Sequence, residues 1–241
     1  MKNKKIFIVM GPFRSGTSLV SRILQQFDIS AGPEDELYEA TDWNPAGYIQ
    51  RPDVTLFNTS MIRQAGGNLT EPPHPEAIAS AIDREFFSSL NLSWIENYAS
   101  VVIKDPRFCF TLLAWIRHSI FADSEVYLIR VSRDIETTAM SALVHYDVKH
   151  YCGNHPDTAR QVIRSYDAFA AWHLENLDLP HFHLVYESLF ETPEKTIRQI
   201  ARFIGKEDEP TISAALAELD EGRSKIDRFS PAGNEEVSTQ G

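Results

Sequence analysis

The sequence is poor in cysteine, lacks long apolar runs and has fewer basic than acidic residues. Cys109 and Cys152 are its only cysteines, and neither has another cysteine near enough to suggest a metal site, so both are expected to be free thiols in a reducing compartment. No segment approaches the ~18 consecutive apolar residues of a membrane span, and the apolar run after MKNKK is too short for a signal peptide. These absences predict a cytoplasmic protein that does not bind membranes.

The charge balance narrows the classes of partner. The chain has 34 acidic residues against 23 lysines and arginines, a formal net charge of −11. This balance argues against binding of nucleic acid but leaves room for a local basic pocket for a small anion. With 241 residues, 43% of them hydrophobic, we predict a single globular domain over residues 1–223. Residues 224–241 have few apolar side chains and are predicted to form a flexible, acidic tail.

Short apolar segments rich in Val and Ile alternate with helical patterns along the chain. Strands buried on both faces are predicted at 5–10, 100–104, 125–130 and 182–186. Helices are predicted at roughly 16–27, 52–65, 76–97, 108–120, 134–148, 157–176 and 193–204. This alternation predicts an α/β fold, a three-layer sandwich around a central parallel sheet. Residues 30–50 contain no clear element and are expected to form a long loop over the sheet edge.

The first motif is the segment Gly11-Pro12-Phe13-Arg14-Ser15-Gly16-Thr17-Ser18, between the first predicted strand and the first predicted helix. Backbone N–H groups of such a loop and the positive end of the helix bind an anion. The two glycines have the spacing of a nucleotide-triphosphate loop, but Thr17 stands where that loop carries its lysine, and the cation is Arg14 instead. The pattern predicts a P-loop-like phosphate site formed by Arg14, Ser15, Gly16, Thr17 and Ser18.

A second motif follows the predicted strand 125–130. Arg130 ends this strand and Thr138 lies eight residues later, in the predicted helix, so a cation and a hydroxyl could hold a second phosphate at the carboxyl edge of the sheet. The alternative is structural: a salt bridge from Arg130 or Arg133 to Asp134, with Thr138 packed on the sheet.

The third motif, Lys104-Asp105-Pro106-Arg107, follows another predicted strand and therefore lies at the same edge. Lys104 and Arg107 would add two cations to the site, and Asp105 could anchor one of them or accept a proton. The alternative interpretation is a turn in which Asp105 caps the following helix.

Together these segments resemble the sulfotransferases that use 3′-phosphoadenosine 5′-phosphosulfate (PAPS), over about residues 5–205. The loop resembles the family's 5′-phosphosulfate loop, and Arg130 with Thr138 resembles its 3′-phosphate motif. Other matching segments are Asn44-Pro45-Ala46-Gly47-Tyr48, Lys104–Arg107 and Tyr186-Glu187-Ser188-Leu189. The chain departs from the family pattern in carrying Arg14 for the loop lysine, Thr138 for serine, Gln50 for a glutamate, and no K-T-H segment.

The resemblance implies transfer of a sulfuryl group from PAPS to a hydroxyl or amine of a small-molecule or carbohydrate acceptor, without a metal. Charge stabilisation would come from Arg14 and Lys104, as preorganised cations at the leaving phosphate. The candidates for the general base are Glu36, Glu39, Asp105 and His145. The acceptor is expected beneath residues 30–50, where Trp43 and Tyr48 are the aromatic pocket candidates.

Two other functions remain open from the residues. A P-loop kinase would require ATP and Mg²⁺ and a lysine before Ser18, which this chain lacks. A non-catalytic nucleotide-binding protein is compatible with Gln50, whose amide cannot act as a base. Binding of PAPS without magnesium, binding of ATP with magnesium, or binding without turnover would separate the three.

Overall fold

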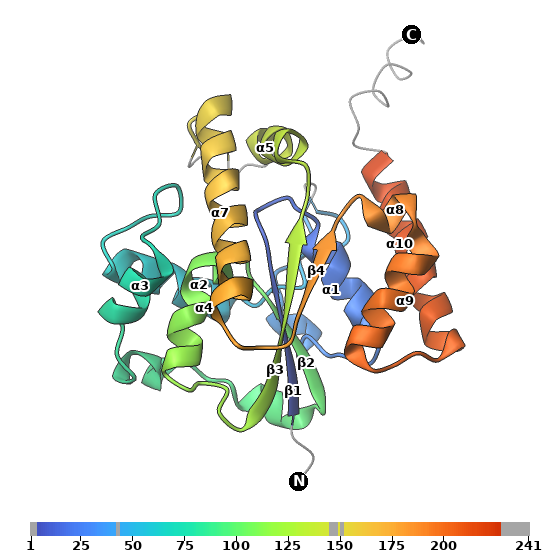
Figure 1. Cartoon of the computed structure of the whole chain (residues 1–241), viewed down its shortest axis with the longest axis horizontal. Coiled ribbons are helices and arrows are strands. Elements are labelled where there is room, and N and C mark those ends of the chain that lie inside the picture. The colour runs from blue at the N-terminus through green and yellow to red at the C-terminus, as the bar shows by residue number, and fades with distance from the viewer. Residues whose placement is uncertain (1–3, 42–43, 145–148, 150–151, 228–241) are drawn as a thin grey trace.

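The computed structural model describes residues 4–41, 44–144, 149 and 152–227, and for 221–227 the backbone only. Its four-stranded parallel sheet has the order β2-β1-β3-β4, formed by β1 (Lys4–Met10), β2 (Ser100–Lys104), β3 (Ser124–Ser132) and β4 (His181–Val185). All four strands were predicted from the sequence. The α/β sandwich with a central parallel sheet is confirmed (Figure 1).

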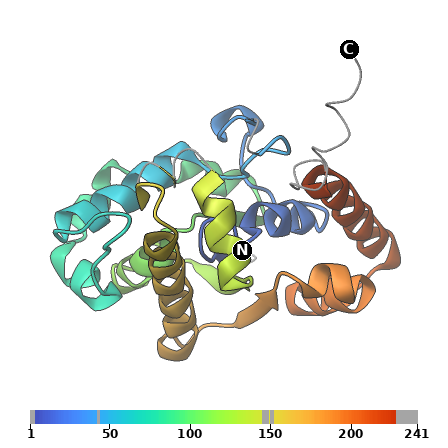
Figure 2. The same cartoon turned by 90° about the horizontal axis from the view of Figure 1, so that it is seen from above.

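The alternation of side chains along β1 divides the core into two halves. Ile6, Ile8 and Met10 pack into the core on one face of the sheet, and Phe7 and Val9 pack into the core on the other. All five side chains are at most 1% exposed. Because both faces are buried, helices cover the sheet on both sides, which gives the three layers (Figures 1 and 2).

Six helices lie close to their predicted positions: α1 (Thr17–Gln25), α2 (Pro52–Gln64), α4 (Phe108–Arg117), α5 (Ile135–Val144), α7 (Pro156–Asn176) and α9 (Pro193–Ile204). Helices α2, α4 and α7 cover the first face of the sheet, and α1 and α9 cover the second. Seen from above, α5 lies beside α7 over the carboxyl edge of the sheet (Figure 2).

The single helix predicted over 76–97 is wrong. The segment forms α3 (Pro75–Ala81) and two short 3₁₀ helices, η2 (Glu85–Ser89) and η3 (Ser93–Asn97). Ile82 is extended, with φ −109° and ψ 134°, which ends α3. Asp83 Oδ1 then accepts from the backbone N–H of Phe86 at 2.9 Å, and Asn91 Oδ1 accepts from Ser93 at 3.0 Å. Both side chains therefore satisfy local backbone donors in place of a continuous helix.

Two helices are not predicted from the sequence, α8 (Ser188–Glu191) and α10 (Glu209–Asp227). Helix α10 begins after Asp208, whose Oδ1 accepts from the backbone N–H of Thr211 at 3.1 Å. Its Ile212, Ala215 and Leu219 are buried against the second core. The start of the predicted tail, 224–227, is helical, and residues 228–241 lie outside the described residues.

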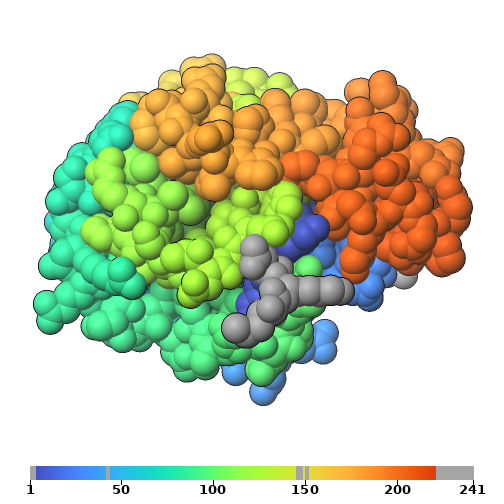
Figure 3. Space-filling view, turned by 60° about the horizontal axis from the view of Figure 1, so that its bottom comes forward, coloured from blue at the N-terminus to red at the C-terminus, as the bar shows by residue number. Residues whose placement is uncertain are grey.

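The C-terminal helices form one flank of the molecule. In the space-filling view, their orange-to-red surface lies on the right of the molecule, and the green surface of the middle of the chain lies on the left (Figure 3). In its described residues, 30–41 and 44–50, the predicted long loop contains one short 3₁₀ helix, η1 (Glu34–Glu36). None of the helices in the described ranges combines the length and the apolar character that crossing a membrane would require.

The strand order places the predicted phosphate loop where the chain changes direction across the sheet. From β1 the chain crosses to β2 on one side and then returns to β3 on the other, so the carboxyl ends of β1 and β3 form a topological switch point. Met10 is in register with Arg130 of β3, and Val9 with Lys104 of β2. The loop that follows Met10 therefore begins between the ends of two neighbouring strands, the usual ligand position of such sheets.

Candidate functional site

Two glycines give the loop after β1 its shape. A Cβ on Gly11 would lie 2.2 Å from the carbonyl oxygen of Val131, and one on Gly16 would lie 2.2 Å from the ring of Tyr186. Gly16 also has φ +96°, and Arg14 adopts the left-handed region with φ 66°. The backbone N–H of Ser15 donates to Pro12 at 3.2 Å and closes the turn. The loop is thus held against β3 and Tyr186 by contacts that no larger residue permits.

The first turn of α1 offers free donors to an anion. Gly16 occupies the N-cap position and, within the described residues, no side chain caps the helix and no acidic residue lies in its first turn. Ser15 Oγ is fully buried and has no hydrogen-bond partner among the described residues. A buried hydroxyl without a partner is rare in folded proteins and indicates a missing ligand atom or water. These features fit a phosphate or sulfate group at the loop.

Arg14 is bound on both sides by the segment that follows β3. Its Nε donates to Ser141 Oγ of α5 at 3.1 Å, and its carbonyl oxygen accepts from Arg133 Nη1 at 3.1 Å. Burial lowers the pKa of Arg14 from its ordinary value, and the nearby charge of Arg133 adds to this effect. The guanidinium of Arg133 also lies over the ring of Tyr186, 4.6 Å from its centre. Two guanidinium groups therefore converge at the loop, where an anion would offset their charge.

The predicted second pair, Arg130 and Thr138, has different partners. Arg130 Nη2 donates to Asp167 of α7 at 2.8 Å, and its Nη1 lies 3.2 Å from His183 Nε2 of β4. Thr138 is fully buried, and its hydroxyl donates to the carbonyl oxygen of Asp134 at 2.7 Å. Hydrogen bonds within the protein thus occupy the Thr138 hydroxyl and both terminal nitrogens of Arg130.

The position of the end of β3 explains this arrangement. The predicted strand ends at Arg130, but β3 continues to Ser132. Arg130 therefore lies inside the ladder, and Arg133 is the first residue beyond it. Arg133 and Ser141 have the same eight-residue spacing as Arg130 and Thr138, shifted by three residues. The repeated arginine and hydroxyl were visible in the sequence, but only the strand boundary selects between the two pairs.

Lys104 ends β2 beside the loop and is only 4% exposed. Its Nζ donates to Gln50 Oε1 at 2.6 Å and to Ser18 Oγ of α1 at 3.4 Å. Desolvation by burial lowers the pKa of Lys104 to about 7, against which the charge of Asp105 acts only in part. The structure therefore brings Lys104 to the first turn of α1.

Asp105 is fully buried and bound on both oxygens. Its Oδ1 accepts from the backbone N–H of Arg107 at 2.7 Å and from the guanidinium of Arg107 at 3.2 Å. Its Oδ2 accepts from the hydroxyl of Thr55 at 2.8 Å and from Gln50 Nε2 at 3.2 Å. This carboxylate holds the turn between β2 and α4 together, in line with the structural alternative for this residue.

The carboxylates of the long loop differ from each other. Glu36 is bound to Arg51 at 2.7 Å, and the buried Arg51 guanidinium stacks on Trp94 at 4.4 Å from the ring centre. Glu39 is exposed, and in the described part of the chain it makes no ion pair or side-chain hydrogen bond. The predicted base His145 and the predicted pocket residue Trp43 lie outside the described residues.

The segment 44–50 folds over the start of α1. Ser18 Oγ donates to the carbonyl oxygen of Tyr48 at 3.1 Å, and Arg22 Nη1 donates to those of Ala46 and Gly47 at 3.2 and 3.3 Å. The phenol of Tyr48 is hydrogen-bonded to Thr41 at 2.7 Å. The loop therefore lies beside the candidate anion site, as the sequence reading expected of the region that covers it.

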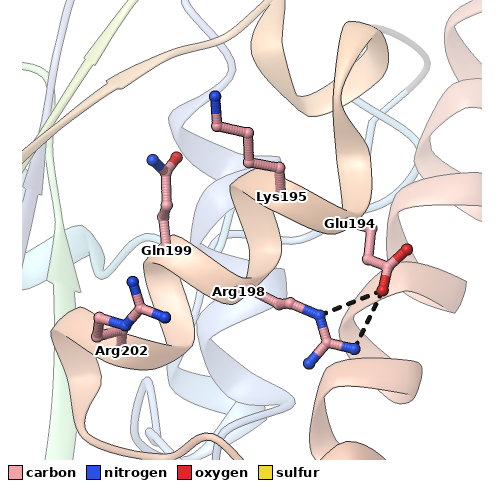
Figure 4. Close-up of a pocket in the computed structure, with 5 residues that line it drawn as sticks. All are labelled: Glu194, Lys195, Arg198, Gln199 and Arg202. Atoms are coloured by element: carbon pink, nitrogen blue, oxygen red, sulfur yellow. Dashed lines mark hydrogen bonds and ion pairs between the residues drawn. The ribbon is translucent and has the colours of Figure 1, made fainter.

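A pocket of about 440 Å³ lies elsewhere, along one face of α9. Its lining residues are Glu194, Lys195, Arg198, Gln199 and Arg202, and Arg198 is paired with Glu194 (Figure 4). No residue of the loop or of the β2 and β3 ends lines it. Its charged side chains are typical of a solvated helix face, so we place the candidate functional site at the loop after β1 and not here.

Known proteins share the fold of this chain. The chain resembles the sulfotransferase domain of the Synechococcus PCC 7002 olefin synthase, with a TM-score of 0.52 and 15% identity over 88% of this chain and 77% of that one. It resembles the sulfotransferase domain of the curacin biosynthetic pathway with a TM-score of 0.51 and 18% identity, over 87% and 76%. At this identity the likeness concerns the fold. No curated protein matches the sequence. The model of the sulfotransferase family matches residues 6–210, so the chain belongs to the sulfotransferase family.

Proposed function

We propose that this sulfotransferase moves a sulfuryl group from PAPS to a hydroxyl or amine of a small-molecule or carbohydrate acceptor. Family membership supports the reaction class. One observation supports the anionic donor most strongly: the buried, unpartnered Ser15 Oγ lies in a loop that leads into an uncapped helix. Such a site binds the phosphosulfate end of the donor through backbone N–H groups.

For the second phosphate of the donor we assign Arg133 and Ser141, in place of Arg130 and Thr138. Arg133 and Ser141 both contact Arg14, so they lie beside the loop. Arg130 instead forms a partly buried ion pair with Asp167 of α7. An arginine fork beside a hydroxyl suits a phosphate monoester, whose oxygens accept several charge-assisted hydrogen bonds.

When bound, the donor supplies an activated sulfuryl group. The acceptor oxygen forms the new bond to sulfur, the bond between sulfur and the phosphate oxygen breaks, and the electron pair remains on the leaving phosphate. Arg14 and Lys104 stabilise this growing negative charge, because they are fixed beside the loop before the reaction begins. Positioning and electrostatics thus carry most of the catalysis, by analogy with phosphoryl transfer.

The proton of the acceptor hydroxyl requires a base, and we assign it to Glu39. Asp105 is fully buried and bound on both oxygens, and Glu36 is paired with Arg51. Glu39 belongs to the same loop and its carboxylate is exposed. Glu39→Gln should therefore lower kcat strongly, whereas Glu36→Gln should mainly weaken the loop structure and raise KM.

Calorimetric titration with adenosine 3′,5′-bisphosphate, 5′-AMP and ATP–Mg²⁺ tests the donor class. We expect binding that needs the 3′-phosphate and no metal. A preference for ATP–Mg²⁺ would favour the kinase, and binding of the bisphosphate without sulfation of any acceptor in a broad screen would favour a non-catalytic binding protein. Lack of binding of all three nucleotides would overturn the proposal.

A further inference from the structure

We propose that Lys104 takes up a proton when the anionic donor binds, because Gln50 gives it a neutral partner where a carboxylate would keep it charged. This inference rests on the proposed function and concerns the same site. It makes donor affinity dependent on pH through one lysine.

The hydrogen-bond partners of Lys104 are neutral. Its Nζ donates to the amide oxygen of Gln50 at 2.6 Å and lies 3.4 Å from the hydroxyl of Ser18. Neither partner carries a charge, and the side chain is nearly enclosed, with 4% of the residue exposed. An ammonium group in such a place loses its hydration without gaining a counter-ion, so burial favours the neutral amine.

The charged groups near Lys104 do not replace that counter-ion. Asp105 precedes α4 and has the opposite charge, but both its oxygens are occupied, one by Arg107 and the other by neutral donors. Arg22 of α1 is paired with Glu218 of α10 at 2.7 Å. The positive charges of Arg107 and Arg22 lower the pKa of Lys104 further, beyond the larger effect of desolvation.

Gln50 is held in the orientation that this arrangement needs. Its Nε2 donates to Thr55 Oγ1 at 2.7 Å and to Asp105 Oδ2 at 3.2 Å, so its oxygen is the atom left for Lys104. A carboxylate at position 50 would place a second negative charge against Asp105, because a carboxylate oxygen only accepts hydrogen bonds. The amide therefore bridges the Asp105 carboxylate and the Lys104 amine without adding a charge of its own.

An anion bound at the loop after β1 would shift Lys104 from the neutral amine toward the protonated form. Ser18 belongs to the uncapped first turn of α1, and its hydroxyl is the group that joins that turn to Lys104. A phosphosulfate on these amides brings negative charge next to Nζ and raises its pKa from about 7. A proton is then taken up between the two pKa values. By linkage, donor affinity falls about tenfold per pH unit above about pH 7, until the pKa of the bound state is reached.

The test is calorimetry of adenosine 3′,5′-bisphosphate at about pH 8.5, in two buffers with different ionisation enthalpies, where the phosphates of the nucleotide are already fully ionised. Wild type should take up close to one proton per nucleotide bound. Lys104→Met should bind more weakly, take up no proton and lose the pH dependence between about pH 7 and 9.

Two variants keep the test decisive. Gln50→Glu retains Lys104 but charges it before binding, so uptake should fall well below that of wild type even if Lys104→Met does not fold. Lys195→Met, which removes an exposed lysine of α9, should behave as wild type. Tight binding without proton uptake in wild type, or equal uptake in Lys104→Met, would overturn the inference while leaving the donor class intact. Absence of any nucleotide binding would overturn both.

Discussion

Two pairs of an arginine and a hydroxyl residue follow one another along β3 and α5, and their side chains have different hydrogen-bond partners. Arg130 is paired with Asp167 through Nη2, although its buried Nε has no partner among the described residues, and the Thr138 hydroxyl donates to a backbone carbonyl. Arg133 and Ser141, three residues further on, both bind the loop residue Arg14. The spacing within each pair is the same, so spacing alone does not identify a ligand site. The partners of each side chain distinguish the pair that stabilises the fold from the pair that faces the loop.

The neighbouring residues Lys104 and Asp105 also differ in the partners that the fold gives them. Asp105 accepts four hydrogen bonds from its surroundings, as a structural carboxylate does. Lys104 is just as buried but has only neutral hydrogen-bond partners. Burial without a counter-charge is costly unless a ligand supplies one. The candidate site thus combines Ser15, a buried hydroxyl without a partner among the described residues, with Lys104, a buried amine whose hydrogen-bond partners are neutral.

The largest effect should follow from Arg14, which both Arg133 and Ser141 contact. Arg14→Ala removes a fixed cation from the loop, so we expect kcat to fall by about 10²–10³-fold with a much smaller change in nucleotide affinity. Initial rates and calorimetry on the same preparation separate the two. Arg198→Ala, on the exposed face of α9, is the matched control. A loss of nucleotide affinity with kcat unchanged would mean that Arg14 only binds the donor.

Substitution of Arg133 should mainly affect nucleotide binding, and substitution of Arg130 should mainly affect stability. Arg133→Ala should weaken adenosine 3′,5′-bisphosphate by about 10–100-fold and 5′-AMP far less, because a charge-assisted hydrogen bond contributes about 1.5–3 kcal/mol. Arg130→Ala should lower the free energy of unfolding by about 1–3 kcal/mol, through loss of the ion pair with Asp167, at nearly unchanged affinity. The reverse pattern would return the second phosphate to Arg130.

The lowered pKa of Lys104 should also make the free energy of unfolding depend on pH. Its pKa in the folded protein lies below its value in the unfolded chain, so between about pH 7 and 10 the unfolded chain binds more protons and wild-type stability rises with pH. Lys104→Met removes this dependence. The stability advantage of the variant should therefore be largest near or below pH 7 and should shrink as the pH rises to about 10. Denaturant titrations of both proteins across this range measure the difference, and a constant difference would contradict the assignment.

The smallest effect should come from the two hydroxyls. Ser141→Ala should weaken the bisphosphate by about fivefold, the value of one neutral hydrogen bond of ~1 kcal/mol. Thr138→Val, which keeps the shape of the side chain, should instead reduce stability by about 1 kcal/mol, since it removes the bond to Asp134. Nucleotide affinity that responds to Thr138→Val and not to Ser141→Ala would reverse the comparison.

The sequence defined the sheet well because its strands are short, apolar and buried on both faces, which leaves a clear signal. It also located the loop at Gly11–Ser18 and the edge that carries Lys104. It failed where local side-chain bonds compete with helix, as at Asp83 and Asn91. Helix α10 was missed although Ile212, Ala215 and Leu219 recur at helical spacing.

Other features depended on tertiary contacts that no sequence pattern contains. The structure pairs Asp105 with Arg107 and Thr55, and Glu36 with Arg51, contacts between residues far apart in the sequence or in a turn. The end of β3 at Ser132 decides which arginine reaches the loop. A strand boundary is set by pairing with its neighbours, so the two residues by which β3 exceeds its predicted end change which arginine is the first beyond the strand.

The most direct test of the central claim is a crystal structure of the protein with adenosine 3′,5′-bisphosphate. We expect the 5′-phosphate on the backbone N–H groups of Gly16, Thr17 and Ser18, and the 3′-phosphate within hydrogen-bond distance of the Arg133 guanidinium and Ser141 Oγ. A 3′-phosphate bound by Arg130 and Thr138, or a nucleotide seated in the pocket along α9, would contradict it.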